Sequence, residues 1–463
     1  MTRICIQNAR IATAKADFIG DVLIENGTIA QIGEGGLPKE VKAGAEVIDA
    51  TGLVLLPGGV DAHTHFDLDV GFTHASDDFY TGSIAAACGG TTSIVDHMAF
   101  GPKGCPLSHQ VQVYHRLAQD AVIDYGFHGV LQHVDEQVLA DMETLLETVG
   151  ISSYKAYMTY DYALHDGDLM RVLERARELG LVICAHCENH EMIQVLRQEC
   201  ESKGQLSPRF HPLSRPSEAE AEAVFRLLML ARAAGNPDVY VVHLSSAQGL
   251  DALRLARSMG SGRIWAETCP QYLFLDDSRY TDDAAGLRHI MCPPLRKQAD
   301  MDALWQAVEA GEINVIGTDH CPFTDEQKAK GKENFMLCPS GAPGVELRMP
   351  LMFSEGYLAG RLTLSQLVQL CCKQPAEIFG LAPRKGDILV GADADLVLFD
   401  PAAKWTVHRA LLHENVDYSL YEGQTLKGRP VLTMSHGEII VQDGVFCGKK
   451  GRGQYLKRRG REA

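Results

Sequence analysis

Two histidines separated by one residue, His63 and His65, end a short apolar segment of the chain. Side chains alternate along a β-strand, so residues two apart point to the same face. A strand that ends in this way can aim both imidazoles at one point, which makes half of a metal site. The pair alone is also typical of ordinary buried or surface histidines. It indicates a metal site only if further ligands occur elsewhere in the chain.

Segments typical of strands alternate with helical segments between residues 57 and 385. Eight such strands are expected, at 60–65, 92–97, 125–131, 153–158, 181–187, 239–244, 263–268 and 313–319. The clearest helix, at 217–235, has an apolar stripe of helical period, and Ser217 with Glu220 predicts a capping box. Eight β-then-α units predict a (β/α)8 barrel rather than a doubly wound sheet.

Further metal-ligand types stand at the ends of the predicted strands. Strand four contributes Lys155, strand five His186, strand six His243 and strand eight Asp319. The carboxyl ends of the strands meet at one face of a barrel, so these residues are expected to converge with the first pair. Nitrogen and carboxylate ligands in this number suit two divalent ions such as Zn²⁺.

Both chain ends are rich in short strands. Asn26-Gly27 predicts a type I′ hairpin in the first segment, and strands return after about residue 385. We expect both ends to pair into one small β-sandwich beside the barrel. The predicted units are residues 1–56 and 386–448 for the sandwich, 57–385 for the barrel, and a basic tail at 449–463. The tail is expected to be solvated or to contact another subunit.

Composition limits the possible partners. The formal net charge of the 463 residues is −17, which argues against nucleic acid and against anionic membrane surfaces. No apolar run approaches membrane-spanning length, and the first residues lack the pattern of a signal peptide. Thirteen cysteines without framework spacing predict reduced thiols and a cytoplasmic protein.

Five motifs together resemble one enzyme family. They are Val-Asp-Ala-His-Thr-His at 60–65, Ser-Tyr-Lys-Ala-Tyr-Met-Thr-Tyr at 153–160, Ala-His-Cys-Glu-Asn at 185–189, Val-His-Leu-Ser at 242–245 and Gly-Thr-Asp-His-Cys at 317–321. The set resembles the cyclic amidohydrolases, in particular the dihydropyrimidinase and hydantoinase branch and its bacterial D-phenylhydantoinase type. The resemblance extends through almost the whole chain, including both β segments.

The resemblance implies a role for each candidate ligand. It assigns one metal to His63, His65 and Asp319 and the other to His186 and His243. Lys155 would be carboxylated (N6-carboxylysine) and bridge two divalent ions, Zn²⁺ or alternatively Mn²⁺ or Co²⁺. An ammonium cannot coordinate a metal, whereas its carbamate offers two anionic oxygens.

The resemblance also implies a mechanism. A hydroxide between the two ions would attack the amide. Asp319 would be the general base as well as a ligand, and Tyr160 would hydrogen-bond the oxyanion. The substrate amide would be held at Cys292 and Ser340, where the family usually has Ser and Asn. Side-chain contacts there would shift substrate preference, whereas backbone contacts would tolerate both replacements.

The predicted reaction is ring opening of 5-substituted aromatic D-hydantoins to N-carbamoyl-D-amino acids. Ring selection is expected in the loops at 66–76 and 159–164, whose apolar residues could accept an aryl group: Phe66, Leu68, Val70, Phe72, Tyr157 and Leu164. Family resemblance implies a homotetramer. Glu267 is interpreted as a structural hydrogen-bonding group, and His97 and His320 as partners that orient ligands.

Several alternatives stay open. Dihydropyrimidinase and allantoinase share the predicted metal site and differ only in ring selection. A dihydroorotase would need an arginine just after the histidine pair, where this chain has Phe66-Asp67. A non-catalytic scaffold of this family would lack the ligands, and a mononuclear deaminase on the same barrel would lack Lys155.

Overall fold

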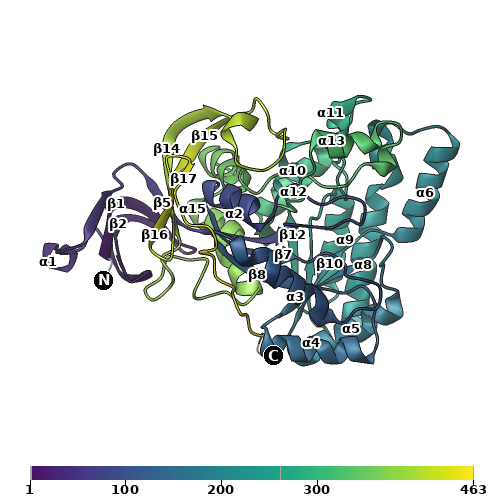
Figure 1. The fold of residues 1–463 in the computed structure, drawn as a ribbon, viewed down its shortest axis with the longest axis horizontal. Coiled ribbons are helices and arrows are strands. Elements are labelled where there is room, and N and C mark those ends of the chain that lie inside the picture. Colours follow the sequence, from purple (N-terminus) through teal and green to yellow (C-terminus); the bar gives the residue numbers. More distant parts are fainter. Residues whose placement is uncertain (1–2, 261, 462–463) are drawn as a thin grey trace.

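The computed structural model describes residues 3–260 and 262–461. It has two parts, a β/α barrel and a β-sheet that lies beside it (Figure 1). The N-terminal strands, drawn in purple, lie next to the C-terminal strands, drawn in yellow. The chain therefore enters and leaves the barrel through the same sheet.

The barrel contains eight parallel strands in sequence order. The barrel closes between the first strand and the segment after the last one, where Thr64 bridges His320 and the His65 N–H donates to the His320 carbonyl at 2.9 Å. This confirms the predicted (β/α)8 class. The strands are β6 (Gly59–Thr64), β7 (Thr91–His97), β8 (Asp124–Val130), β9 (Ser153–Tyr157), β10 (Val182–His186), β11 (Asp238–Val241), β12 (Ile264–Thr268) and β13 (Val315–Ile316).

Apolar runs explain why these strands were recognisable in the sequence. All residues of β7, β8 and β10 are buried, because helices cover the outside of the barrel and side chains fill its inside. The eighth strand is much shorter than predicted. β13 has only two residues, and it ends three residues before Asp319.

Helices follow most barrel strands and form the outer layer (Figure 1). The longer ones are α2 (Phe79–Cys88), α3 (Leu107–Leu117), α4 (Glu136–Thr148), α5 (Asp166–Leu179), α6 (His190–Ser202), α8 (Ser217–Ala233), α9 (Ala247–Ser258) and α12 (Gln298–Glu309). Shorter helices are α1 (Lys39–Lys42), α7 (His211–Ser214), α10 (Pro270–Phe274), α11 (Ala284–Leu287), α13 (Asp325–Lys328), α14 (Arg348–Leu351), α15 (Leu364–Val368) and α16 (Gln374–Ile378).

The predicted capping box at the start of α8 is wrong. Pro216 precedes the first helical residue, Ser217, and no side chain caps the helix. Glu220 is buried and instead accepts hydrogen bonds from the backbone N–H and the hydroxyl of Ser245, at 2.8 and 2.9 Å. Glu220 points into the protein, and a buried carboxylate needs hydrogen-bond donors nearby. It therefore contacts Ser245 instead of capping the helix.

Strands from both chain ends form one mixed sheet of nine strands. β5 (Val54–Pro57) joins the two halves, because it pairs with β1 (Arg3–Ala12) and with β14 (Leu396–Thr406). The predicted pairing of the two ends is confirmed. The other strands are β2 (Asp17–Glu25), β3 (Thr28–Glu34), β4 (Glu46–Asp49), β15 (Thr425–Ser435), β16 (Glu438–Gln442) and β17 (Val445–Phe446).

The predicted hairpin at Asn26-Gly27 is confirmed between β2 and β3. Both turn residues have positive φ, 50° and 85°, as a type I′ turn requires. The sheet closes over its own apolar core, to which residues of both chain ends contribute, including Ile6, Val22 and Leu398.

The C-terminal tail was predicted to be solvated or to contact another subunit, and the structure shows that part of it is buried within this chain. Tyr455 forms a bridge with Tyr125 of β8. Arg458 is 1 % exposed and donates to the Ser153 hydroxyl at 2.9 Å and to the Phe127 carbonyl. Arg458 departs from the prediction because buried acceptors such as the Phe127 carbonyl satisfy its guanidinium as well as water would.

A buried charged cluster joins the barrel to the sheet. The Lys385 Nζ contacts carboxylate oxygens of Asp124, Asp393 and Asp395 at 2.6, 2.9 and 2.7 Å. His436 also contacts Asp124, at 2.6 Å. Burial raises the pKa of Asp124, but the hydrogen bond from His436 and the charge of Lys385 outweigh it and hold that pKa well below its usual range.

All thirteen cysteines are free thiols. Among the described residues, no helix combines the length and the apolar character that crossing a membrane needs.

Candidate active site

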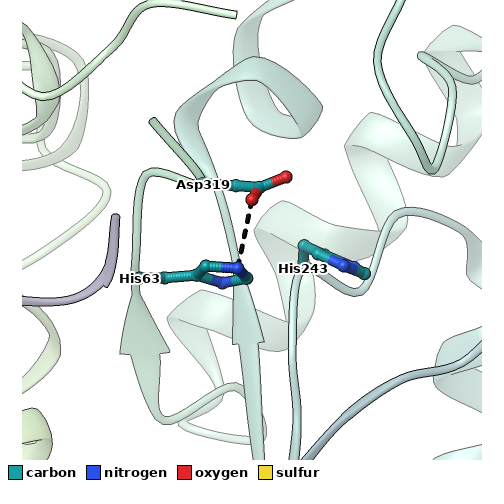
Figure 2. A group of neighbouring side chains, drawn as sticks. All are labelled: His63, His243 and Asp319. Atoms are coloured by element: carbon teal, nitrogen blue, oxygen red, sulfur yellow. Dashed lines mark ion pairs between the residues drawn. The ribbon is translucent and has the colours of Figure 1, made fainter. Parts of the chain in front are cut away.

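The barrel brings all six predicted ligands to one end of its strands. The Asp319 Oδ1 lies 3.1 Å from the His63 Nε2 and 3.0 Å from the His65 Nε2. The Lys155 Nζ lies 3.4 Å from the His63 Nε2. Figure 2 shows His63 directed at Asp319, with His243 on the neighbouring side of the same space.

The second half of the site is built from the next two strands. The Nδ1 atom of His186 faces the Nε2 atom of His243 at 2.9 Å. His186 is the last residue of β10, and His243 follows β11 by two residues. Ligand atoms of His63, His243 and Asp319 all lie within 4.8 Å of one another, so one small group of ions can reach both halves.

Two buried glutamates fix the orientation of these imidazoles. Glu267 contacts the His63 Nδ1 at 2.5 Å and accepts from the His243 backbone N–H at 3.0 Å. Glu188 contacts the His186 Nε2 at 2.7 Å and is paired with Arg215. Each glutamate holds one ring nitrogen and leaves the other free to face the site, which is the usual carboxylate–histidine support of a metal ligand.

Glu267 was identified from the sequence, but only a structural hydrogen-bonding role was predicted for it. Glu188 and Arg215 were not identified at all, although the spacing of Glu188 two residues after His186 was visible. Arg215 gave no signal, because it comes from the loop before α8 and meets Glu188 only through the fold.

The donor set fits divalent metal ions. It offers imidazole nitrogens and a carboxylate, and buried Nδ1 atoms of His65 and His243 have no partner among the described residues. Lys155, 1 % exposed, is the exception, since an ammonium cannot coordinate. Its position among the ligands fits a metal site if the amine carries a carboxylate group.

Burial controls the charge of the histidines. It lowers the pKa of His65 to about 4, and it lowers those of His186 and His243 as well. The neutral imidazole is the form that binds a metal. Burial acts in the same direction on His63, but the charge of Glu267 outweighs it and raises that pKa to about 9.

Asp319 is ionised in this environment. Burial raises the pKa of its carboxyl, but His63 and His65 outweigh that effect and hold the pKa well below its usual range. The carboxylate is partly open to the cavity, with a side chain 14 % exposed. It can therefore both bind a cation and accept a proton from a group in the cavity.

Three residues of the site have backbone in the left-handed region. Among the described non-glycine residues nine have positive φ, and His243, Asp319 and Tyr160 are three of these, at 38°, 53° and 74°. Such conformations cost about 1–3 kcal/mol each and persist where the surrounding structure fixes them. Here they turn the three side chains out of the strand direction and towards the cavity.

A cavity of about 1110 Å³ opens above the ligands. Its wall includes five of the six, with His63 behind them, and also Tyr160, Cys292 and Ser340. Tyr160 is half-buried; its ring lies 5.1 Å from that of His186 and has the Arg215 guanidinium 5.3 Å above it. Burial raises the pKa of Tyr160 well above its usual value, so the hydroxyl stays a hydrogen-bond donor.

Cys292 and Ser340 meet in the wall of the same cavity, next to Tyr160. Their side chains contact each other, Sγ to Oγ, at 3.4 Å. Within the described residues, the backbone N–H and C=O of both have no hydrogen-bond partner. Unpaired backbone groups at a cavity wall need a polar ligand or water. A ring amide, with one N–H and one C=O, matches such groups.

The predicted apolar surface is only partly correct. Leu68, Val70, Phe72 and Tyr157 line the cavity, but Phe66 and Leu164 do not. The Phe66 ring instead packs edge-on against Phe79 of α2 and against His320.

Two further aromatic residues belong to the wall: Tyr162, which lies within the predicted loop at 159–164, and Phe100, which lies outside both predicted loops. Phe100 follows β7, and its ring centre lies 5.0 Å from that of Tyr157 and 4.5 Å from that of Tyr162. The three rings form one aromatic wall (Phe100, Tyr157 and Tyr162) beside the metal ligands. Phe100 gave no periodic signal because it lies in a loop.

Two further histidines lie beside the ligands. His320 holds Asp77 at 3.0 Å and accepts from the Gly344 N–H at 3.1 Å, which fixes the chain next to Asp319. His97 stacks on His128, with ring centres 4.1 Å apart, and meets His63 edge-on. Both lie where residues that orient ligands were expected.

Comparison with known proteins places this geometry in a family. Residues 54–440 match the amidohydrolase family. The chain is 46 % identical to D-phenylhydantoinase from Escherichia coli (strain K12) over 459 residues, 99 % of this chain and 98 % of that protein. The solved dihydropyrimidinase from Brevibacillus agri NCHU1002 superposes with a TM-score of 0.96 at 39 % identity, covering 100 % of both chains. A D-hydantoinase from a Thermus species superposes with a TM-score of 0.94 at 37 % identity over 99 % of both.

The chain belongs to the amidohydrolase family. Within it, the chain is of the hydantoinase and dihydropyrimidinase type, as the five motifs predicted. The predicted enzyme class, a metal-dependent hydrolase of amide bonds, is confirmed at this level.

Proposed function

We propose that this enzyme opens the ring of 5-substituted D-hydantoins with an aromatic substituent and releases N-carbamoyl-D-amino acids. The observation that carries the proposal is the convergence of six candidate ligands on a cavity whose wall includes Cys292 and Ser340, two residues with unpaired backbone amide groups. The similarity to D-phenylhydantoinase supports the same substrate class.

The six residues would hold two divalent ions, most simply Zn²⁺, with Mn²⁺ and Co²⁺ as alternatives. His63, His65 and Asp319 would hold one ion, His186 and His243 the other, and carboxylated Lys155 would bridge them. Two bound cations supply a water nucleophile at neutral pH and polarise an amide carbonyl.

Asp319 would move the proton of the reaction. Water adds to the ring carbonyl carbon and the C–N bond breaks. The Asp319 carboxylate takes a proton from the attacking water and gives it to the leaving ring nitrogen, so it returns to its ionised state. Tyr160 would donate its hydroxyl hydrogen to the oxyanion that forms at the same carbon.

Cys292 and Ser340 would hold the ring through their backbone. The free N–H and C=O groups match the C=O and N–H of a cyclic amide, and no side-chain atom is needed for these contacts. This is the arrangement in which the departures from the usual serine and asparagine are tolerated.

The aromatic wall would face the 5-substituent. An aryl group there gains about 1.5–3 kcal/mol when it is fully buried. Leu68 and Val70 extend the apolar surface from the loop after β6. A small ring without a substituent gains little from these contacts.

A second candidate is dihydropyrimidinase. The solved dihydropyrimidinase favours it, because that structure superposes on this chain as closely as a solved D-hydantoinase does, with TM-scores of 0.96 and 0.94. Allantoin is a third candidate substrate, because it is also a cyclic amide. A non-catalytic scaffold is disfavoured by the retention of all six candidate ligands and Tyr160. The homotetramer and the cytoplasmic location remain predictions.

The test is ring opening by metal-loaded protein, followed by the amide absorbance, on D- and L-5-phenylhydantoin, dihydrouracil and allantoin. We expect fast turnover of D-5-phenylhydantoin and little of the others. Faster turnover of dihydrouracil would assign the enzyme to pyrimidine rings, and no turnover of any ring would refute the proposal.

A further inference from the structure

A buried lysine lies behind the wall that carries Cys292 and Ser340. Lys328 ends α13 and is 1 % exposed. Its Nζ donates to the carbonyls of Ile290 and Pro339, both at 2.8 Å, and of Gly341 at 2.7 Å. Among the described residues it forms no ion pair, although its Nζ lies 5.7 Å from the centre of the Phe323 ring.

Three acceptors identify the charge state of this lysine. A neutral amine has two N–H groups and one lone pair, so it would leave a carbonyl facing that lone pair. Only the ammonium supplies three donors. Burial lowers the pKa of Lys328, and this cost makes a buried cation without a carboxylate an unusual choice for structure alone.

The three carbonyls belong to the two segments that form the cavity wall. Ile290 precedes Cys292 by two residues, and Pro339 and Gly341 flank Ser340. The Gly341 N–H also donates to the Ile290 carbonyl at 3.0 Å, so the segments are paired directly as well as through Lys328. The ammonium therefore fixes the spacing between Cys292 and Ser340.

One of these contacts has an electronic effect. The Pro339 carbonyl and the Ser340 N–H are two ends of the same peptide group. A cation bound to the oxygen polarises that group and makes its N–H a stronger donor, as in chains of hydrogen bonds. That N–H has no partner among the described residues, and Ser340 is one of the residues that line the cavity.

We propose that Lys328 is a positioning residue for the substrate amide, which it serves by fixing the Cys292 and Ser340 segments and by strengthening the Ser340 N–H as a donor. This inference rests on the proposed function. In this arrangement the Lys328 ammonium supports the groups that bind the ring and does not contact the ring itself.

The experiment compares Lys328→Met, which keeps the side-chain length without donors, with Lys328→Gln, which keeps two donors without charge. Lys385→Met is the matched control, because it removes an equally buried lysine that lies at the junction of barrel and sheet. Metal-loaded proteins are compared in kcat and KM for D-5-phenylhydantoin, in melting temperature and in metal content.

We expect KM to rise about 10-fold or more in Lys328→Met and less in Lys328→Gln, with kcat within about 3-fold of wild type, because uniform binding is lost. Lys385→Met should lower the melting temperature and leave KM unchanged. An unchanged KM in both Lys328 variants, or an equal rise in Lys385→Met, would overturn the inference. If Lys328→Met does not fold, an unchanged KM in Lys328→Gln alone overturns it. A wild type that opens no cyclic amide would refute the proposed function itself.

Discussion

Replacing Tyr160 with phenylalanine isolates one hydroxyl group. The ring should keep its place, because Arg215 lies over its face and His186 against it. The melting temperature and metal content of Tyr160→Phe should therefore equal those of wild type. What is lost is a donor whose acceptor carries full negative charge only in the transition state.

The expected cost follows from that difference. Loss of one oxyanion donor typically costs about 2.7–4 kcal/mol, which lowers kcat about 10²- to 10³-fold. KM should change by less than about 3-fold, because the ground-state carbonyl forms a weaker hydrogen bond. The assay is steady-state hydrolysis of D-5-phenylhydantoin by metal-loaded protein.

Tyr157→Phe is the matched control. Tyr157 also lines the cavity, but its hydroxyl has no hydrogen-bond partner among the described residues, and its ring packs against Phe100. We expect its kcat to stay within about 3-fold of wild type. A fall in kcat of less than about 5-fold in Tyr160→Phe, or equal falls in the two variants, would refute the role of Tyr160.

Three other changes test the metal support, the aromatic wall and the charged cluster. Glu267→Gln removes the carboxylate that holds His63, so metal affinity measured against a competing chelator should fall about 10- to 100-fold. Phe100→Ala should lower kcat/KM for D-5-phenylhydantoin about 10-fold and leave dihydrouracil unaffected, since only an aryl substituent reaches the wall. Lys385→Met removes the cation that three buried carboxylates share and should destabilise the fold by about 3–5 kcal/mol in thermal or urea unfolding. Asp124 has a lowered folded pKa, so its stabilisation is present above about pH 4 and is lost as pH falls; that of Lys385, whose folded pKa is raised, is lost only above about pH 10.

Each of these expectations has a result that contradicts it. Unchanged metal affinity in Glu267→Gln would mean that His63 needs no support. An equal loss on both substrates in Phe100→Ala would indicate a folding defect instead of a substituent contact. A Lys385→Met protein as stable as wild type at pH 7 would show that the charged cluster does not stabilise the junction between barrel and sheet.

One physical reason made both the barrel and its ligands predictable from the sequence. Buried parallel strands need continuous apolar runs, and a functional side chain at the end of such a run stands out. His186 and Asp319 were identified in this way, even though β13 is only two residues long. The eight strands were therefore correct within a few residues.

Contacts that depend on the fold could not be predicted. Arg458 is far from Ser153 in sequence, and nothing local separates a basic residue that binds buried carbonyls from one in solvent. The capping box failed for a related reason, since Glu220 meets Ser245 of the next loop instead of its own helix start. Lys328 belongs to the same class, because its three acceptors come from two loops.

Counting the metal ions per chain in wild type and in Lys155→Ala, together with turnover of D-5-phenylhydantoin, is a direct test of the binuclear site. We expect about two ions and fast turnover in wild type. The variant should lose at least one ion and its activity, and a short carboxylate such as acetate or propionate should restore both. A wild type that is active without bound metal, or a Lys155→Ala protein with full metal content and activity, would contradict a metal site bridged by Lys155.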